Sequence, residues 1–303
     1  MTLLSALRRL MLRRSRRQSG QGHAVGAGLA SAESVQRLAN ALNKLEVYVT
    51  LMHDNQQRQE RLNMLVARGV ISGLMQNKVD EVPSVSPPQR SLSLEEQFSV
   101  LAERAPLNIE QWKQTFSAGE EAYSIPTDAD LSVSGHLEAG YFRMFVNAYA
   151  EGRVLDIGTG PLPVPVYLAD IPVGRLAGID PLPPITPHPF IFAQTYAEFL
   201  PWEDCSFETV TVGTSLDHVY LLDVALDEIA RVLTAEGKLL LWTGLFEDTF
   251  PYDPYSATIT PPDRFHLFHP GKNWFWKVLA DKFDVLETIE IQSGNYLIAL
   301  EKK

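Results

Sequence analysis

Two aspartates and two glycines near the middle of the chain have the spacing of a nucleoside-binding site. The sequence Val-Leu-Asp-Ile-Gly-Thr-Gly is an apolar run that carries Asp156 and then breaks at Gly158 and Gly160. Without Cβ atoms, the backbone can turn tightly there and approach a ligand. A second apolar run ends on Asp180, close to the spacing at which an acid meets ribose hydroxyls in a doubly wound sheet. The alternative is an ordinary strand-to-helix turn.

The dinucleotide-binding fingerprint is incomplete in this chain. Pro161, Leu162 and Pro163 follow Gly160, so no third glycine stands in the expected place. A helix start that binds pyrophosphate is therefore disfavoured. Pro163, at the position of the third glycine, also weakens the case for a nicotinamide-dependent dehydrogenase.

Three stretches in order resemble the class I S-adenosylmethionine-dependent methyltransferases. The first is the glycine turn, which alone is a weak signal. Residues 197–208, Ala-Glu-Phe-Leu-Pro-Trp-Glu-Asp-Cys-Ser-Phe-Glu, are similar to the family's loop before the fourth strand. Residues 226–237, Leu-Asp-Glu-Ile-Ala-Arg-Val-Leu-Thr-Ala-Glu-Gly, are similar to its helix and turn before the fifth. The resemblance covers residues 152–303 and is closest to the broad group typified by ubiquinone and menaquinone biosynthesis methyltransferases.

This resemblance implies that S-adenosyl-L-methionine is the cofactor. It implies that the two glycines approach the methionine part, Asp156 helps to orient the ammonium group, and Asp180 binds the ribose hydroxyls. The implied contacts are Asp156, Ile157, Gly158, Thr159, Gly160, Asp180, Pro181, Ala197, Glu198 and Thr214. Alternatively, both aspartates cap nearby amides. The family often has an acid where this chain has Tyr196, so stacking by Tyr196 or a hydrogen bond from Glu198 would replace it at the adenine.

Histidines are the candidates for a general base, because an alcohol or amine acceptor must lose a proton near neutral pH. His218 follows the expected fourth strand, at the carboxyl edge where open sheets bind ligands, with Asp217 before it. His266 lies in an aromatic and proline-rich insertion, 246–276, that we expect to form the substrate wall. Either histidine could instead be structural. The sequence shows no Cys/His cluster that suggests a metal.

The pattern of the second half predicts an α/β fold with a Rossmann-like seven-stranded methyltransferase sheet. Apolar runs alternate with helical patterns, which is typical of a parallel sheet, and Ser293-Gly294 joins a final hairpin that adds an antiparallel last strand. A helical coiled-coil region precedes this sheet. The expected strands are 153–157, 175–179, 190–193, 209–213, 238–242, 283–291 and 295–301.

Five regions follow from composition and periodicity. They are a basic amphipathic helix and flexible joint at 1–30, a helical coiled coil at 31–75, a proline-stiffened linker at 76–93, a helical substrate-covering segment at 94–150, and the cofactor-binding domain at 151–303. The coiled coil rests on a heptad seam formed by Val35, Leu38, Leu42, Leu45, Val49 and Met52. The seam predicts a homo-oligomer. The alternative is a long helix packed on its own domain.

Charge and cysteine content limit the partners and the compartment. The net charge is −11, yet residues 1–32 carry six arginines and no acid. The acidic body should repel nucleic acid, whereas the basic helix, with apolar Leu3, Leu7, Leu10 and Met11, suits an anionic membrane surface or a mitochondrial transit peptide. It could also be a solvated terminus. The single cysteine, Cys205, excludes an internal disulfide and favours a cytoplasmic location, or the mitochondrial matrix if the terminus is a transit peptide.

These observations predict an S-adenosylmethionine-dependent methyltransferase acting on a small molecule, a lipid-linked intermediate or a glycan, by O-methylation. The alternative is a coiled-coil assembly protein whose methyltransferase-like domain is weakly active or inactive. Tyr196 and the prolines after Gly160 are the features that favour this alternative.

Overall fold

The computed structural model describes residues 32–76, 84–89, 92–105, 109–124, 136–248, 253–255 and 262–303. The expected basic helix at 1–30 lies outside these residues. Among the described helices, none combines the length and apolar character needed to span a bilayer. Contacts divide the chain into two units, Met1–Gln59 and Glu60–Lys303, and the division falls inside helix α2 (Ala32–Gln76). The sequence instead suggested a boundary in the linker at 76–93.

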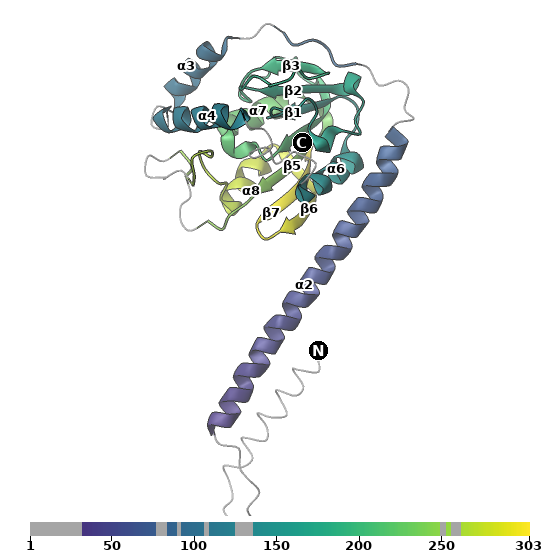
Figure 1. Cartoon of the computed structure of the whole chain (residues 1–303), viewed down its shortest axis with the longest axis vertical. Coiled ribbons are helices and arrows are strands. Elements are labelled where there is room, and N and C mark those ends of the chain that lie inside the picture. Colours follow the sequence, from purple (N-terminus) through teal and green to yellow (C-terminus); the bar gives the residue numbers. More distant parts are fainter. Residues whose placement is uncertain are drawn as a thin grey trace, which may run out of the picture. The chain divides into compact units, whose positions relative to one another are not determined.

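The second unit is built on a seven-stranded sheet with the order β3-β2-β1-β4-β5-β7-β6 (Figure 1). Strands β1 to β5 run parallel, and β7 pairs antiparallel with both β5 and β6. This confirms the predicted methyltransferase sheet and its antiparallel last strand. The strands are β1 (Val154–Ile157), β2 (Leu176–Asp180), β3 (Ile191–Gln194), β4 (Phe207–Gly213), β5 (Leu233–Gly244), β6 (Phe283–Gln292) and β7 (Asn295–Lys302).

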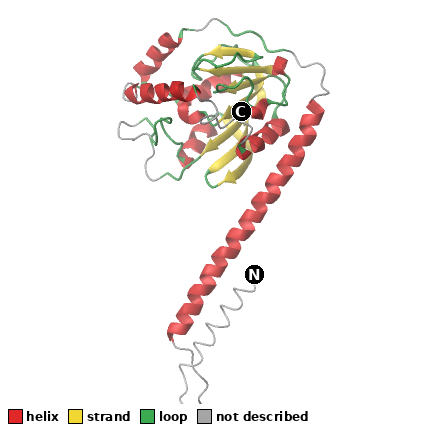
Figure 2. Cartoon of the chain, viewed as in Figure 1, coloured by secondary structure: helices red, strands yellow, loops and turns green. Residues whose placement is uncertain are grey.

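The central strands are buried on both faces, so both faces need a cover. Every residue of β1 and β2 is buried, as expected for parallel strands with apolar residues pointing both ways. One apolar core joins the sheet to α7 (Leu222–Val232) and α8 (Lys272–Ala280), and includes Leu101 of α3 (Leu94–Arg104) and Trp112 of α4 (Ile109–Tyr123). Figure 2 shows the strands in yellow with helices around them.

The opposite face is covered by helices from the N-terminal side of the sheet. Pro161, Pro163 and Pro165 follow β1, and the connection to β2 contains only two single 3₁₀ turns, Val166–Leu168 and Val173–Arg175. Proline removes a backbone donor and clashes inside a helix, which explains why no α-helix forms there. The second apolar core instead contains residues of α6 (Leu137–Tyr149) and of the end of α2, namely Ala139, Phe142, Phe145, Val146, Leu62 and Leu65.

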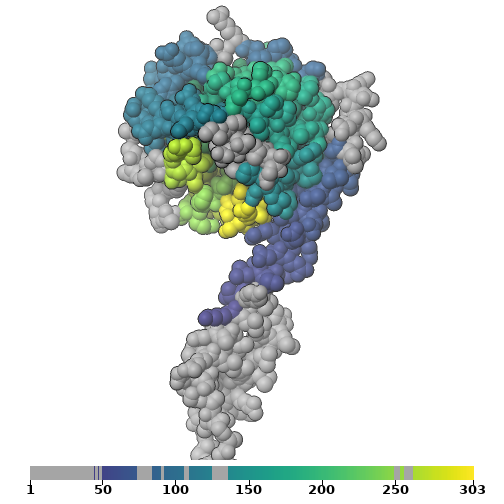
Figure 3. Space-filling model, in the orientation of Figure 1, coloured from purple at the N-terminus to yellow at the C-terminus, as the bar shows by residue number. Residues whose placement is uncertain are grey.

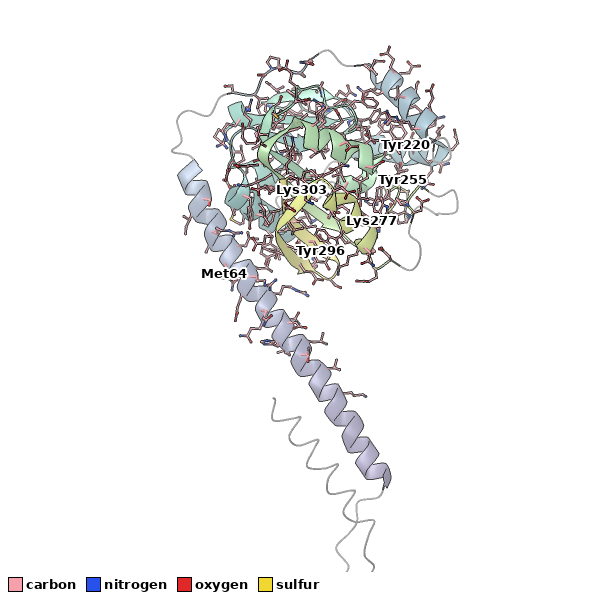
Figure 4. The ribbon with its side chains drawn as sticks, turned by 180° about the vertical axis from the view of Figure 1, so that it is seen from behind. Met64, Tyr220, Tyr255, Lys277, Tyr296 and Lys303 are labelled. Atoms are coloured by element: carbon pink, nitrogen blue, oxygen red, sulfur yellow. The ribbon has the colours of Figure 1, made fainter. Side chains whose placement is uncertain are left out.

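The end of α2 approaches α6 closely because two glycines face it. A Cβ atom on Gly69 would lie 2.4 Å from the Met144 carbonyl oxygen, and one on Gly73 would lie 3.0 Å from Asn147 Nδ2. Arg68 donates to Glu287 of β6 at 2.7 Å, and its guanidinium lies 4.6 Å from the centre of the Tyr149 ring. Met64, by contrast, is 66% exposed (Figure 4). The end of α2 is therefore part of the core of the second unit.

Substituting alanine at Gly69 and at Gly140 should have opposite effects on stability. Both glycines are helical, so propensity alone favours alanine by about 1 kcal/mol at each. A Cβ on Gly140 meets nothing within 4 Å, whereas one on Gly69 overlaps Met144 backbone. We expect Gly140→Ala to raise the free energy of unfolding and Gly69→Ala to lower it by about 1–3 kcal/mol. Urea unfolding of both variants measures this, and a stabilised Gly69→Ala would show that α2 does not pack on α6.

Removing residues 1–59 should lower the molecular mass of the particle in solution while preserving the domain. Met52, the last residue of the predicted heptad seam, is 54% exposed, and a second copy packed along the seam would cover it. We expect light scattering to find an oligomer for the full chain and a monomer for the protein that begins at Glu60. Equal subunit numbers would contradict self-association through this seam. A shorter protein that begins near Leu92, at the end of the predicted linker, would not be a suitable comparison, because it lacks the core residues Leu62 and Leu65.

Candidate functional site

A cavity of about 780 Å³ lies at the carboxyl ends of the central parallel strands. All the predicted site residues except Asp156 line it, from the glycine turn to both candidate histidines. Its lining includes Ile157, Gly158, Thr159, Gly160, Asp180, Pro181, Ala197, Glu198, Thr214, His218 and His266. Helix α4 adds Trp112, Phe116 and Tyr123 to the wall. Figure 3 shows α3 and α4 in blue beside the yellow-green C-terminal part of the chain, and Gln111 bonds the Leu267 carbonyl there at 3.1 Å.

The glycine turn takes the conformation that its sequence predicts. Gly158 and Gly160 have φ angles of +74° and +77°, which side chains rarely allow. A Cβ on Gly158 would lie 2.4 Å from Ser215 Cβ, so the turn also needs the missing atom for space. The N–H groups of Gly158 and Thr159 donate to the Ile179 carbonyl at 2.9 and 3.0 Å. The turn is thereby fixed to the end of β2.

Asp180 stands at the centre of a small hydrogen-bond network at the cavity wall. Its Oδ1 accepts from the Leu182 N–H at 2.8 Å, and its Oδ2 accepts from the Gly160 N–H at 3.0 Å. The Tyr123 hydroxyl, at the end of α4, also donates to Oδ2 at 2.8 Å. The carboxylate thus connects the turn after β1, the turn after β2 and the helical cover. Sequence reasoning missed Tyr123, because nothing in its local sequence marks it as a partner of Asp180.

Asp156 lies behind the turn instead of on the cavity wall. Its side chain is fully buried and accepts hydrogen bonds from Thr211 Oγ1 at 2.6 Å and from the Tyr167 hydroxyl at 3.1 Å. Burial raises the pKa of Asp156 to about 7, against the opposing effect of these hydrogen bonds. The carboxyl therefore supports the turn from the protein side, and direct contact with a ligand's ammonium group is not what this geometry shows.

The region expected to receive a base is walled by aromatic rings. The Tyr196 ring centre lies 5.3 Å from that of Trp112, and the Tyr220 ring centre lies 5.9 Å from that of the same tryptophan. Glu198 is 4% exposed, and its carboxylate accepts from the Leu221 N–H at 2.8 Å. Burial raises the pKa of Glu198 to about 7, although backbone hydrogen bonds lower it. Both predicted replacements for the absent acid thus line the cavity.

Thr214 has strained backbone at the end of β4. Its φ angle is +61°, a rare value for a β-branched residue. The strain is held by a hydrogen bond from its N–H to the Trp242 carbonyl at 2.8 Å. Such strain clusters at ligand sites, which agrees with the place of Thr214 on the cavity wall.

His218 and His266 come together although 47 residues separate them in the sequence. Their ring centres are 4.6 Å apart, and Asp217 lies beside both, with carboxylate oxygens 3.7 Å from His218 Nε2 and 3.8 Å from His266 Nε2. The side chain of His218 is 45% exposed, towards the cavity that it lines. Desolvation by the surrounding protein lowers the pKa of His218, against the attraction of Asp217, which favours the neutral imidazole. Sequence reasoning proposed the two histidines separately and found no cluster.

Part of the domain matches a known protein family. Residues 155–241 match the family model described as a methyltransferase domain. No curated protein matches the chain at a significant level. Among solved structures, the chain is similar to 1,6-didemethyltoxoflavin-N1-methyltransferase from Burkholderia thailandensis, with 13% identity, 74% of this chain and 97% of the other covered, and a TM-score of 0.48. It is also similar to the N-methyltransferase NodS from Bradyrhizobium japonicum, with 16% identity, coverage of 62% and 98%, and a TM-score of 0.45.

The raised pKa of Asp156 predicts a loss of stability with rising pH. In the unfolded chain this carboxyl ionises near pH 4, whereas in the folded protein it holds its proton to about pH 7. The folded state therefore binds more protons between these values, and the free energy of unfolding falls as pH rises from about 4 to 7, then levels off. Asp156→Asn cannot titrate and retains an oxygen for Thr211 and Tyr167.

Urea unfolding at pH 5 and pH 8 tests this point. We expect wild type to lose about 1–3 kcal/mol more than Asp156→Asn over this interval. The raised pKa of Glu198 also lowers the free energy of unfolding as pH rises, and it does so in wild type and in Asp156→Asn. The difference between the two proteins therefore reports on Asp156. Parallel pH profiles would show that Asp156 is ionised in the folded protein.

Proposed function

Because residues 155–241 belong to a methyltransferase domain with the class I S-adenosylmethionine-dependent fold, we propose that the chain is an enzyme that methylates an oxygen atom. The acceptor that we propose is a small molecule, a lipid-linked intermediate or a glycan. The observation that carries this function is a single cavity that joins the glycine turn and Asp180 to the paired histidines. The end with the glycine turn and Asp180 suits a nucleoside, and the end with the histidines can accept a proton from the methyl acceptor.

The residues of this cavity fit S-adenosyl-L-methionine. The cavity volume lies within the usual range for a small-molecule site. At Gly158 and Gly160 the backbone presents no side chain to a ligand, and the Asp180 carboxylate lines the cavity as a hydrogen-bond acceptor for a ribose hydroxyl. The aromatic ring of Tyr196 offers a stacking surface for the base. The cofactor would supply an electrophilic methyl group.

The chain's own residues would orient the acceptor and exclude water. Trp112, Phe116 and Tyr220 supply an aromatic part of the cavity wall, which would exclude water from the reacting groups. His218 is the proposed proton acceptor for the acceptor hydroxyl, since its lowered pKa leaves the imidazole neutral near pH 7. His266 lies beside it and is the second candidate.

A second function stays open because of Tyr123. Its hydroxyl already bonds Asp180 at 2.8 Å, at the carboxylate that a ribose would need. If this contact persists, the domain would bind cofactor weakly and the chain would act as an assembly protein through α2. Cofactor titration separates the two functions. We keep self-association through α2, membrane-surface contact through residues 1–30 and a cytoplasmic location as proposals that rest on the sequence.

Replacing Asp180 with alanine should weaken cofactor binding. We expect calorimetry with S-adenosylhomocysteine to find one site on wild type and a loss of about 1–3 kcal/mol in Asp180→Ala, through lost hydrogen bonds. The matched variant Tyr123→Phe removes only the competing hydroxyl, so its affinity should equal or exceed that of wild type. Equal affinity of Asp180→Ala and wild type would remove Asp180 from the ribose site. No binding to wild type would favour the assembly protein.

Replacing His218 with alanine should reduce turnover without loss of cofactor affinity. A positioned base contributes about 10² to 10⁴-fold, and we expect a decrease of that size in methyl transfer from labelled cofactor. The side chain is partly exposed to the cavity, so thermal unfolding should change little. A large fall in stability with unchanged turnover per folded molecule would identify His218 as structural, and His266 would become the leading candidate.

A further inference from the structure

We propose that Asp217, His218 and His266 bind a divalent transition-metal ion in the cavity wall. Asp217 and His218 belong to the 3₁₀ turn Leu216–His218 after β4, and His266 belongs to the described segment before α8. Each of the three offers a ligand atom, and these atoms all lie within 4.8 Å of one another. Two imidazoles with one carboxylate form a ligand set for first-row metals such as iron, cobalt and zinc.

The separations suit a shared ion better than direct hydrogen bonds. The Asp217 carboxylate oxygens lie 3.7 Å from His218 Nε2 and 3.8 Å from His266 Nε2, too far for either ring to donate to them. Ligand atoms at about 2.0–2.2 Å from a tetrahedral ion lie about 3.4 Å apart. Because the three ligand atoms lie within 4.8 Å of one another, side-chain shifts of about 1 Å would bring them onto one ion.

Asp217 shows the clearest need for a cation. Its Oδ1 is buried, and no hydrogen-bond partner for it exists among the described residues. A buried carboxylate oxygen without a partner is costly and rare, and an ion is one of the few explanations for it. The Leu267 N–H donates to the Asp217 backbone carbonyl at 3.3 Å, which holds the carboxylate next to the histidine segment.

His266 is oriented as metal-binding histidines are. Its Nδ1 lies 2.8 and 2.7 Å from the two carboxylate oxygens of Asp263, so Nε2 is the nitrogen directed to Asp217. Asp263 is itself held by the N–H groups of Phe265 and His266, at 2.7 and 3.0 Å. A carboxylate behind the ligating ring fixes its tautomer and raises its basicity. The charges of Asp217 and Asp263 together balance a divalent ion.

A second group of potential ligands shares His266 but fits less well. It consists of Asp263, His266 and His269. In this group an ion would have to enter between Asp263 and His266 Nδ1, which are already in direct contact. His269 is also stacked on Phe246, with ring centres 4.6 Å apart. His269 therefore provides a variant that distinguishes the two groups.

The ion would change how an acceptor is activated. Three protein ligands leave at least one coordination position open, and the cavity is lined by all three side chains. An acceptor hydroxyl bound there would have its pKa lowered by the ion and would release its proton to solvent. His218 and His266 would then hold the metal, which replaces the role of proton acceptor given to His218 above. This consequence rests on the proposed function, whereas metal binding itself does not.

Metal titration of the full chain, free of any added histidine tag and stripped with a chelator, tests the site without cofactor or acceptor. We expect Zn²⁺ calorimetry and Co²⁺ absorption to give one ion per chain. Asp217→Asn and His218→Gln should each weaken binding at least 10-fold, as losses of a ligand do. The controls are His53→Gln, an exposed histidine of α2, and His269→Gln, which should both bind as wild type does.

Three results would overturn the assignment. They are no saturable 1:1 binding by wild type, unchanged binding by both Asp217→Asn and His218→Gln, and loss of binding in His269→Gln with His218→Gln intact, which would place the ion in the other group. Thermal unfolding in the absence of metal shows whether each variant is folded. If a variant is not folded, the wild-type titration and the other variant still test the site. Metal binding without any methyl transfer would refute the proposed function and leave the metal site in place.

Discussion

The fold depends on covering both faces of a parallel sheet whose strands are apolar throughout. After β1, prolines prevent the α-helix that would cover one face on the way to β2. Helix α6 and the end of α2 take that place, with Phe142, Phe145, Leu62 and Leu65 in the core. The part of α2 from Glu60 onwards is therefore structurally necessary to the domain, and only the part before Glu60 is available for a further role.

The same constraint shapes the cavity. Helices α3 and α4 belong to the core on the other face, and from there α4 carries Trp112 into the wall and Tyr123 to Asp180. A single carboxylate then joins the glycine turn to the helical cover. Under the proposed function a ribose hydroxyl would bind the carboxylate that the Tyr123 hydroxyl already contacts, so ligand binding would affect the position of the end of α4.

Local patterns account for what the sequence predicted. Apolar runs separated by helical patterns and turn residues predicted the strands. The glycines at positions 158 and 160 predicted a tight turn, which the positive φ angles confirm. Packing partners far apart in the chain were not predictable in this way. The burial of Gly69 against Met144, the bond from Tyr123 to Asp180 and the place of Asp156 behind the turn all depend on contacts between elements, which a single sequence does not encode locally.

The chain topology brings His218 and His266 together, which explains why the sequence alone did not predict the cluster. His218 lies just after β4 and His266 precedes α8, and the adjacent parallel strands β4 and β5 end at the same edge of the sheet. The long segment after β5 returns to that edge, where Leu267 bonds Asp217 and Gln111 of α4 bonds Leu267. Ligands that are remote in sequence become neighbours only because both connections end at one rim. A search for short metal-binding spacings cannot find such a site, whereas the buried and unpartnered Oδ1 of Asp217 points to it directly.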